Sequence, residues 1–159
     1  MHSREDNIND PYYYYQIAVV DGKELADRLI KKNMNCVSLV GYSFGSLVIY
    51  ECLMELKKRE ATGIIEDVIL LGLPAIVNLD QWKSIRQIVP GRLINGYIQN
   101  DSFLNYISSN YLSFNQVCGK MKIELDYIES YDLSSIVMDH MDYPREMKRI
   151  FEAINIKNC

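Results

Sequence analysis

The hydrophobic and polar positions along this chain follow two periods in turn, and each period predicts a different kind of element. Two runs, CVSLV (36–40) and EDVILLGLP (66–74), are almost wholly apolar and reach a glycine at their ends, which is typical of buried strands. RLINGYIQND (92–101) predicts a third strand that ends in polar residues. The alternating segment KIELDYIES (122–130) predicts a fourth.

Segments with apolar residues three and four positions apart separate these strands and predict helices. The predicted helices cover VVDGKELADRLIKKN (19–33), residues 44–58, LDQWKSIRQIVPG (79–91) and YPREMKRIFEAINI (143–156). We expect Asp21 to cap the first helix, with Glu24 completing a capping-box pattern, and Asp80 to cap the third. Pro144 suits the first turn of the last helix.

Strands alternating with helices indicate an α/β fold with a mostly parallel sheet and flanking helices. We expect a loose lead-in over residues 1–15 and one domain over residues 16–159, with a helical or irregular excursion over residues 102–121. In such sheets the functional groups gather beyond the C-terminal ends of the strands. The residues that follow each predicted strand are therefore the first candidates for a site.

Composition and charge narrow the class of protein. The chain has 159 residues, of which 48% are hydrophobic and 24% charged, as in soluble globular domains. The net charge is −4, and the densest basic cluster, residues 57–59, falls at the end of a predicted helix, where it suits the helix dipole. Nucleic-acid binding is therefore not expected, because it depends on clustered basic residues that face phosphates.

The cysteines and the N-terminal sequence bear on metal sites and on location. The four cysteines, at positions 36, 52, 118 and 159, show neither a C-x-x-C pair nor zinc-like spacing, so we expect no metal site. Cys36 and Cys52 lie in apolar surroundings and are predicted to be small core residues. The N-terminal residues lack the apolar stretch of a signal peptide, and we expect a reducing, cytoplasmic setting.

The uncharged stretch between Lys32 and Glu51 raises the alternative of a membrane helix, and it contains the small-residue spacing G-x-x-x-G at Gly41 and Gly45. A spanning helix needs roughly 20 mainly apolar residues. Five polar residues interrupt this stretch: Asn33, Asn35, Ser38, Ser43 and Ser46. We therefore interpret it as a strand, a turn and a helix.

The sequence G-Y-S-F-G (41–45) joins the first predicted strand to the helix that follows. This is the setting of a nucleophile elbow, in which a serine stands on strained backbone between two small residues. Gly41 and Gly45 would let strand and helix approach, with Tyr42 beside the serine. Ser43 is then the candidate nucleophile, and the amide of Phe44 is the candidate oxyanion donor at the helix N-terminus.

A serine hydroxyl needs a base, and the base needs a carboxylate to orient it. His2 lies in the lead-in, so His140, after the last predicted strand, is the candidate base. Asp101 ends the third strand, and the order Ser, Asp, His is the one found in α/β-hydrolases. Four other aspartates are rivals for this role: Asp126, Asp132, Asp139 and Asp142.

Three long segments resemble one known family. VSLVGYSFGSLVIYECLMEL, GIIEDVILLGLPAIVNLDQWKSIRQIVPGRLINGYIQND and DLSSIVMDHMDY are similar to the C-terminal half of the α/β-hydrolase domain of the transmembrane and coiled-coil domain-containing protein 4 family. The resemblance covers most of the chain from about residue 22. It implies a lipase- or esterase-like serine hydrolase with Ser43, Asp101 and His140 at the triad positions. It also implies membrane association in longer members, through segments that precede this domain.

The chain departs from the family pattern at two residues and in the strands and loop that can be recognised. Family elbows often carry Leu where Phe44 stands, and a Gly often precedes the histidine, where this chain has Asp139, a carboxylate that we expect to reorient the ring or raise its basicity. The strands that precede the elbow strand in a complete α/β-hydrolase, and the loop that supplies a second oxyanion donor, are also not found. CVSLV is then expected to be an exposed apolar edge.

Three explanations of that edge stay open. YYYYQIAVV (12–20) would donate a replacement strand, a homodimer or partner chain would cover the edge, or the sequence is a fragment of a longer protein. Two functions therefore compete: a serine hydrolase that cleaves an ester or related acyl bond of a small molecule or lipid without a cofactor, and an inactive remnant that acts as a protein-interaction module. Acyl transfer to an acceptor other than water is a weaker third hypothesis.

Overall fold

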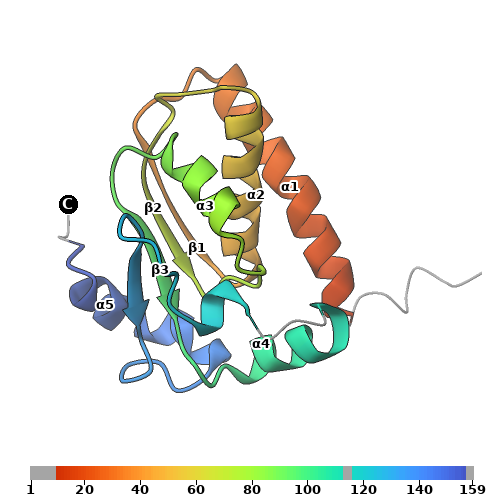
Figure 1. Cartoon of the computed structure of the whole chain (residues 1–159), viewed down its shortest axis with the longest axis vertical. Coiled ribbons are helices and arrows are strands. Elements are labelled where there is room, and N and C mark those ends of the chain that lie inside the picture. Colours follow the sequence, from red (N-terminus) through yellow and green to blue (C-terminus); the bar gives the residue numbers. More distant parts are fainter. Residues whose placement is uncertain (1–9, 113–115, 157–159) are drawn as a thin grey trace, which may run out of the picture.

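In the computed structural model, which describes residues 10–112 and 116–156, four parallel strands form one sheet in the order β1-β2-β3-β4. The strands are β1 (Val37–Tyr42), β2 (Ile65–Leu71), β3 (Leu93–Tyr97) and β4 (Glu129–Asp132). The helices are α1 (Pro11–Lys31), α2 (Phe44–Lys58), α3 (Leu79–Arg86), α4 (Ser102–Ile107) and α5 (Tyr143–Ala153). The predicted α/β fold with a parallel sheet and flanking helices is confirmed (Figure 1).

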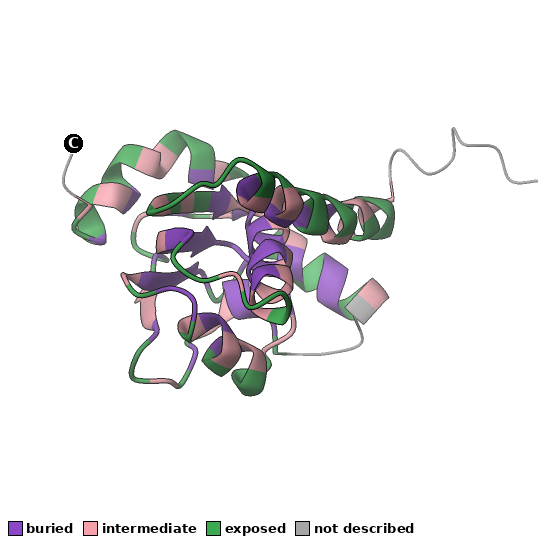
Figure 2. Cartoon of the chain, turned by 90° about the horizontal axis from the view of Figure 1, so that it is seen from above, coloured by how far each residue is buried: buried purple, intermediate pink, exposed green. Residues whose placement is uncertain are grey.

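Two apolar clusters hold the helices to the two faces of the sheet. Val68 and Leu70 of β2 belong to the cluster that contains the buried residues of α1, α2 and α3. Ile69 and Leu71 of the same strand belong to a second cluster with Ile150 of α5. Successive side chains of a strand point to opposite faces, so α5 covers one face of the sheet and α1, α2 and α3 cover the other. Figure 2 shows the buried residues concentrated between these layers.

The first helix begins ten residues before the predicted cap. Asp10 caps α1 by accepting a hydrogen bond from the amide of Tyr12 at 2.9 Å, and a proline stands in the first turn. An aspartate cap followed by proline is a stronger start signal than Asp21, which lies in mid-helix. The expectation that YYYYQIAVV supplies a strand is therefore wrong, and so is the inclusion of residues 11–15 in a loose lead-in. Residues 1–9 of that lead-in lie outside the described residues.

Gly22 stands in the middle of α1 because α2 passes very close to it. A Cβ atom built at Gly22 would lie 2.5 Å from the Cβ of Glu51 and 2.7 Å from the carbonyl oxygen of Val48. Glycine is unfavourable inside a helix by about 1 kcal/mol, and here it allows the two helices to pack side by side (Figure 1).

Three other predictions need correction. Asn78, rather than Asp80, caps α3, because its side chain accepts from the amides of Asp80 and Gln81. Most of segment 122–130 does not join the sheet. A turn bond from the amide of Leu125 to the carbonyl of Ile123 bends the backbone there, and β4 starts only at residue 129. Cys36 is exposed, whereas Cys52 is buried as expected.

The sheet leaves β1 at its edge, as the sequence suggested. Val40 of β1 is 48% exposed.

No described helix combines the length and the apolar character needed to cross a lipid bilayer.

Candidate active site

Ser43 occupies the single residue between the end of β1 and the start of α2. Its backbone has φ 54° and ψ −127°, a conformation that a non-glycine residue rarely adopts. Hydrogen bonds on both sides hold it there: its amide donates to the carbonyl of Leu71 at 2.9 Å, and its carbonyl accepts from the amide of Ser46 at 3.0 Å. Strain of this kind costs on the order of 1–3 kcal/mol and persists only where the surroundings enforce it.

The glycines around Ser43 are not equivalent. A Cβ atom at Gly41 would lie 2.7 Å from both the Cα and the amide nitrogen of Ser46, so the strand and the helix touch there. A Cβ atom at Gly45 would meet nothing within 4 Å. Gly41 therefore has the packing role that the sequence suggested, and the same expectation for Gly45 is wrong. Ser46 is fully buried, and its hydroxyl donates to the carbonyl of Ser43 at 2.6 Å.

His140 reaches Ser43 from the other end of the chain. It begins a short 3-10 turn, His140–Asp142, directly before α5, and its ring nitrogen Nε2 lies 2.7 Å from the Oγ atom of Ser43. The other ring nitrogen, Nδ1, lies 2.6 Å from Oδ2 of Asp101. With the proton on Nδ1, the ring donates to Asp101 and accepts the serine hydroxyl. The structure thus brings the three predicted residues into one line of hydrogen bonds.

Asp101 is held by its own helix. It precedes α4 as the N-cap, and its Oδ1 atom accepts from the amide of Leu104 at 2.8 Å, which leaves Oδ2 for the ring of His140. Asp101 is fully buried and His140 is 1% exposed, whereas Ser43 is partly exposed. A buried carboxylate is stable only when paired, so this contact fixes the orientation of the imidazole.

The rival aspartates have other partners or lie elsewhere. The carboxylate of Asp139 accepts from the amide and hydroxyl of Ser102 and from the amide of His140, and these hydrogen bonds hold the pKa of Asp139 below its usual value. Asp142 accepts from the amide of Asp139, and Asp132 accepts from Ser134. Asp126 is exposed. Asp139 therefore holds the backbone before His140. Its carboxylate makes no hydrogen bond to the imidazole, so the expectation that Asp139 reorients the ring is not met.

Residues from three segments surround the imidazole. The ring of Phe103 has its centroid 4.6 Å from that of His140, and the ring of Tyr42 has its centroid 5.1 Å away. The Tyr42 hydroxyl donates to the carbonyl of His140 at 2.8 Å, and burial raises the pKa of Tyr42 to about 12, so the phenol stays a donor. A Cβ atom at Gly72, where φ is 57°, would lie 3.2 Å from Cε1 of His140.

Only partial signals for these neighbours are present in the sequence. Tyr42 was identified only as part of the turn, Gly72 only as the end of a strand, and Phe103 only as one apolar residue of an excursion. A glycine after a strand end is a signal for close approach, but it does not say which side chain approaches.

The start of α2 offers unpaired amide groups. The first amides of a helix have no intrahelical acceptor, and the carbonyl of Ser43 is taken by Ser46 and Leu47. The amides of Phe44 and Gly45 are the first two of α2 and directly follow Ser43, and the N-terminus of a helix favours nearby negative charge. Within residues 10–112 and 116–156, no three His, Cys, Asp or Glu side chains gather as they would around a metal ion.

Comparisons with known proteins identify relatives over most of the chain. The model of a family described as "Protein of unknown function (DUF726)" matches residues 2–157. The chain is 39% identical over 139 residues to the probable lipase MIL1 of Saccharomyces cerevisiae, which covers 85% of this chain and 13% of that protein. It is 35% identical over 142 residues to an uncharacterized membrane protein of Caenorhabditis elegans, or 86% of this chain and 23% of that protein.

A third relative carries a name close to the resemblance drawn from the motifs. The transmembrane and coiled-coil domain-containing protein STS1 of Oryza sativa subsp. japonica is 32% identical over 138 residues, which are 85% of this chain and 21% of that protein. The chain thus spans between 13% and 23% of the length of these three relatives. No solved structure matches the chain.

Proposed function

Since the chain belongs to the DUF726 family, in which one relative is named a probable lipase, we propose that it is a serine hydrolase that cleaves carboxylic esters at Ser43. The observation that carries this proposal is the line of hydrogen bonds from Ser43 through His140 to Asp101, with lengths of 2.7 Å and 2.6 Å. Contacts of this length lie within the reach that proton transfer requires.

In the proposed reaction, Oγ of Ser43 attacks the ester carbonyl while Nε2 of His140 takes the hydroxyl proton. Asp101 holds the ring in the tautomer that leaves Nε2 free and stabilises the imidazolium that forms. The Phe44 amide donates to the oxyanion, and His140 then returns the proton to the leaving alcohol. A water molecule repeats these steps on the acyl-enzyme and releases the carboxylic acid.

The fold supports a finer assignment, that this domain is part of an α/β-hydrolase-like fold. Ser43 follows β1, Asp101 comes after β3, and His140 comes after β4, so all three lie beyond the C-terminal ends of parallel strands. The positive φ of Ser43 and the tight contact of Gly41 with Ser46 are the features that a nucleophile elbow needs. The same residues would also support acyl transfer to another acceptor.

The experiment is covalent labelling with a fluorophosphonate, followed by mass spectrometry of the modified peptide. We expect one adduct, on Ser43, which Ser43→Ala abolishes. Ser38→Ala is the matched control, because Ser38 lies on the same strand, is exposed and has no contact with His140. Absence of an adduct, or an adduct that persists in Ser43→Ala, would contradict the proposal.

A second candidate function, protein binding through β1, is favoured by the exposed sheet edge. β1 (VSLVGY) carries no charged residue, and Val40 is 48% exposed. Charged side chains commonly protect the edges of natural sheets against pairing with another sheet, and two uncharged edges can meet without repulsion.

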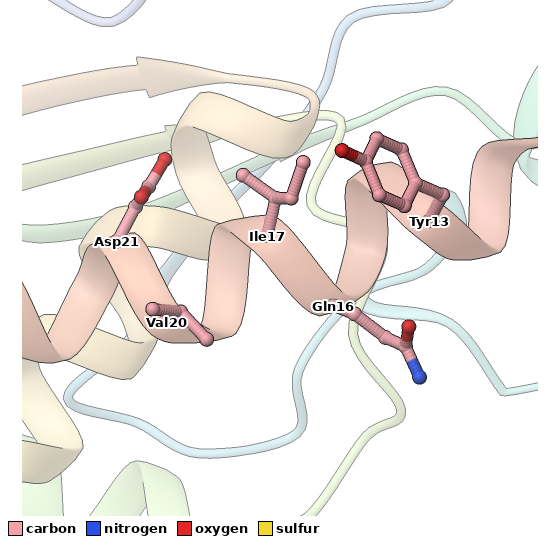
Figure 3. A pocket seen from close by; sticks show the side chains of 5 residues that line it. All are labelled: Tyr13, Gln16, Ile17, Val20 and Asp21. Atoms are coloured by element: carbon pink, nitrogen blue, oxygen red, sulfur yellow. The ribbon is translucent and has the colours of Figure 1, made fainter. Parts of the chain in front are cut away.

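The outer face of α1 is also apolar in part. A hollow of about 240 Å³ lies along Tyr13, Ile17 and Val20, and Val20 is 63% exposed (Figure 3).

For this second candidate, we propose that β1 pairs with β1 of a second copy about a two-fold axis. Sedimentation should then show a dimer, and Val40→Lys should shift it to monomer by placing two like charges at the junction. Leu79→Lys, at an exposed apolar residue of α3, is the matched control and should leave the dimer intact. A monomer in the unmodified protein would reject pairing between copies.

A further inference from the structure

We propose that three aromatic side chains beside Ser43 bind the acyl chain of the substrate, so that the enzyme prefers esters of long-chain acids to esters of short-chain acids. The three residues are Phe103, Phe44 and Tyr14, which we call the aromatic track. The inference rests on the proposed hydrolase function and adds the substrate class to it.

The track begins at the imidazole and leads away from it ring by ring. The centroid of Phe103 lies 4.6 Å from that of His140. The centroid of Phe44 lies 5.9 Å from that of Phe103, with the rings perpendicular, and the centroid of Tyr14 lies 6.2 Å from that of Phe44. These separations fall within the range of aromatic rings in contact, so the track is one continuous surface.

Each residue of the track lies near the start of a different helix. Phe103 lies on α4, directly after the Asp101 cap, and Phe44 is the first residue of α2, directly after Ser43. Tyr14 lies in the first turn of α1. An acyl group attached to Ser43 therefore has an apolar side chain on the adjacent residue and two more beyond it.

The track is partly accessible to solvent. Phe44 and Phe103 are partly buried, whereas Tyr14 is 41% exposed. The three side chains carry one polar atom between them, the Tyr14 hydroxyl, so the accessible surface is mainly apolar. Each methylene group of the acyl chain that moves from water onto such a surface makes the binding free energy more favourable. Longer chains therefore bind progressively more tightly.

If these rings only pack α4 against α2 and α1, removing one would lower the stability of the fold but would not change the preference among chain lengths. The test must therefore measure a ratio between two substrates on one protein. That ratio is insensitive to the fraction of protein that is folded, because both substrates report on the same folded molecules.

The test compares two fluorophosphonates, one with an ethyl and one with a dodecyl chain on phosphorus, each kept below its critical micelle concentration. In both, Oγ of Ser43 forms the bond to phosphorus, the P–F bond breaks, fluoride leaves, and His140 takes the hydroxyl proton. We expect the second-order rate constant for labelling to be at least about tenfold higher for the dodecyl compound, as expected for burial of several methylene groups.

Variants then locate the preference. Tyr14→Ala should lower the dodecyl-to-ethyl ratio about threefold or more, and Phe103→Ala should lower it further because Phe103 lies closer to the reacting atoms. Tyr14→Phe keeps the ring and should retain the ratio. Tyr127→Ala removes a tyrosine that is 38% exposed and lies outside the track, and it should leave the ratio unchanged.

The outcomes separate this inference from the function on which it rests. Equal labelling rates for the two compounds, or a preference that survives both Tyr14→Ala and Phe103→Ala, would overturn the aromatic track while leaving the hydrolase proposal in place. Failure of both compounds to label Ser43 would remove the hydrolase proposal, and the track with it.

Discussion

The Nε2 atom of His140 lies 2.7 Å from the Oγ atom of Ser43, although the two residues are 97 positions apart in the sequence. The contact joins the end of β1 to the turn before α5, and the buried carboxylate of Asp101 lies on the far side of the ring. Four predictions follow from the surroundings of this contact.

Asp101→Asn should reduce the rate of Ser43 labelling or ester cleavage by about 10³- to 10⁴-fold. An amide in place of the carboxylate no longer selects the ring tautomer that leaves Nε2 free to accept the serine proton. The measurement is the second-order rate constant with an ethyl fluorophosphonate, with folding checked by circular dichroism. Asp132→Asn is the control, since Asp132 bonds Ser134 and Gln99 rather than the ring. Comparable losses in both variants would argue against the assigned role of Asp101.

Gly41→Ala and Gly45→Ala should have opposite effects on the free energy of unfolding. The Gly41 variant drives a Cβ atom to within 2.7 Å of the Ser46 backbone and should destabilise the fold by about 1–3 kcal/mol. The Gly45 variant meets open space and should be neutral or stabilising by up to about 1 kcal/mol, because alanine is the better helix former. Urea denaturation of both variants measures the difference. Equal destabilisation would mean that the contact between strand and helix does not limit the turn.

Tyr42→Phe should cost about 1 kcal/mol of stability, because it removes the hydrogen bond from the Tyr42 hydroxyl to the carbonyl of His140 but retains the ring. We also expect slower labelling of Ser43, because that bond helps to hold the turn that carries the imidazole. Urea denaturation and the labelling rate test the two effects separately. An unchanged labelling rate would show that Asp139 and Asp142 hold the turn without Tyr42.

Asp139 should make the protein acid-sensitive. Hydrogen bonds from Ser102 hold the pKa of Asp139 below its usual value of 3.8, so the folded state favours the ionised carboxylate. The stability that this gives is complete above about pH 4 and is lost as the pH falls through the lowered pKa. Asp139→Asn should therefore be destabilised relative to the unmodified protein at pH 6, with a smaller difference near pH 3.

The measurement for Asp139 is the free energy of unfolding in urea at both pH values. Asp80→Asn is the control, because Asp80 is exposed on α3 and pairs with Lys83 rather than with Ser102, so it should give no such difference. A gap between Asp139→Asn and the unmodified protein that stays constant from pH 6 to pH 3 would contradict the role given to ionisation.

Local patterns in the sequence were sufficient for most of the elements. The apolar run before G-Y-S-F-G predicted β1, and the helix that follows spans Phe44–Lys58 as expected. The predicted cap of α1, Asp21, lies eleven residues after the observed cap, Asp10, because the Asp-Pro start outweighs the capping-box pattern in mid-helix. Burial alternates over residues 122–126 although they form no strand, since period-two burial also arises in a turn whose apolar residues reach the core.

The residue types of the candidate site were also accessible from the sequence, because chemistry limits them. A serine on a tight turn needs a base, and only two histidines were available. Its neighbours were not accessible. The contacts of Ser102 with Asp139, of Gly72 with His140 and of Phe103 with His140 join residues that are distant along the chain, and no local pattern encodes such pairs.

By itself, the sequence determined most of the strands and helices and that a serine stands between β1 and α2, because hydrophobic period, glycine spacing and capping act over a few residues. Only the tertiary structure decided that Asp101, rather than four other aspartates, meets the imidazole, and that Tyr14 of α1 lies against Phe44. The physical reason is that packing of the sheet and its helices sets which distant side chains meet, and that packing depends on the whole chain at once.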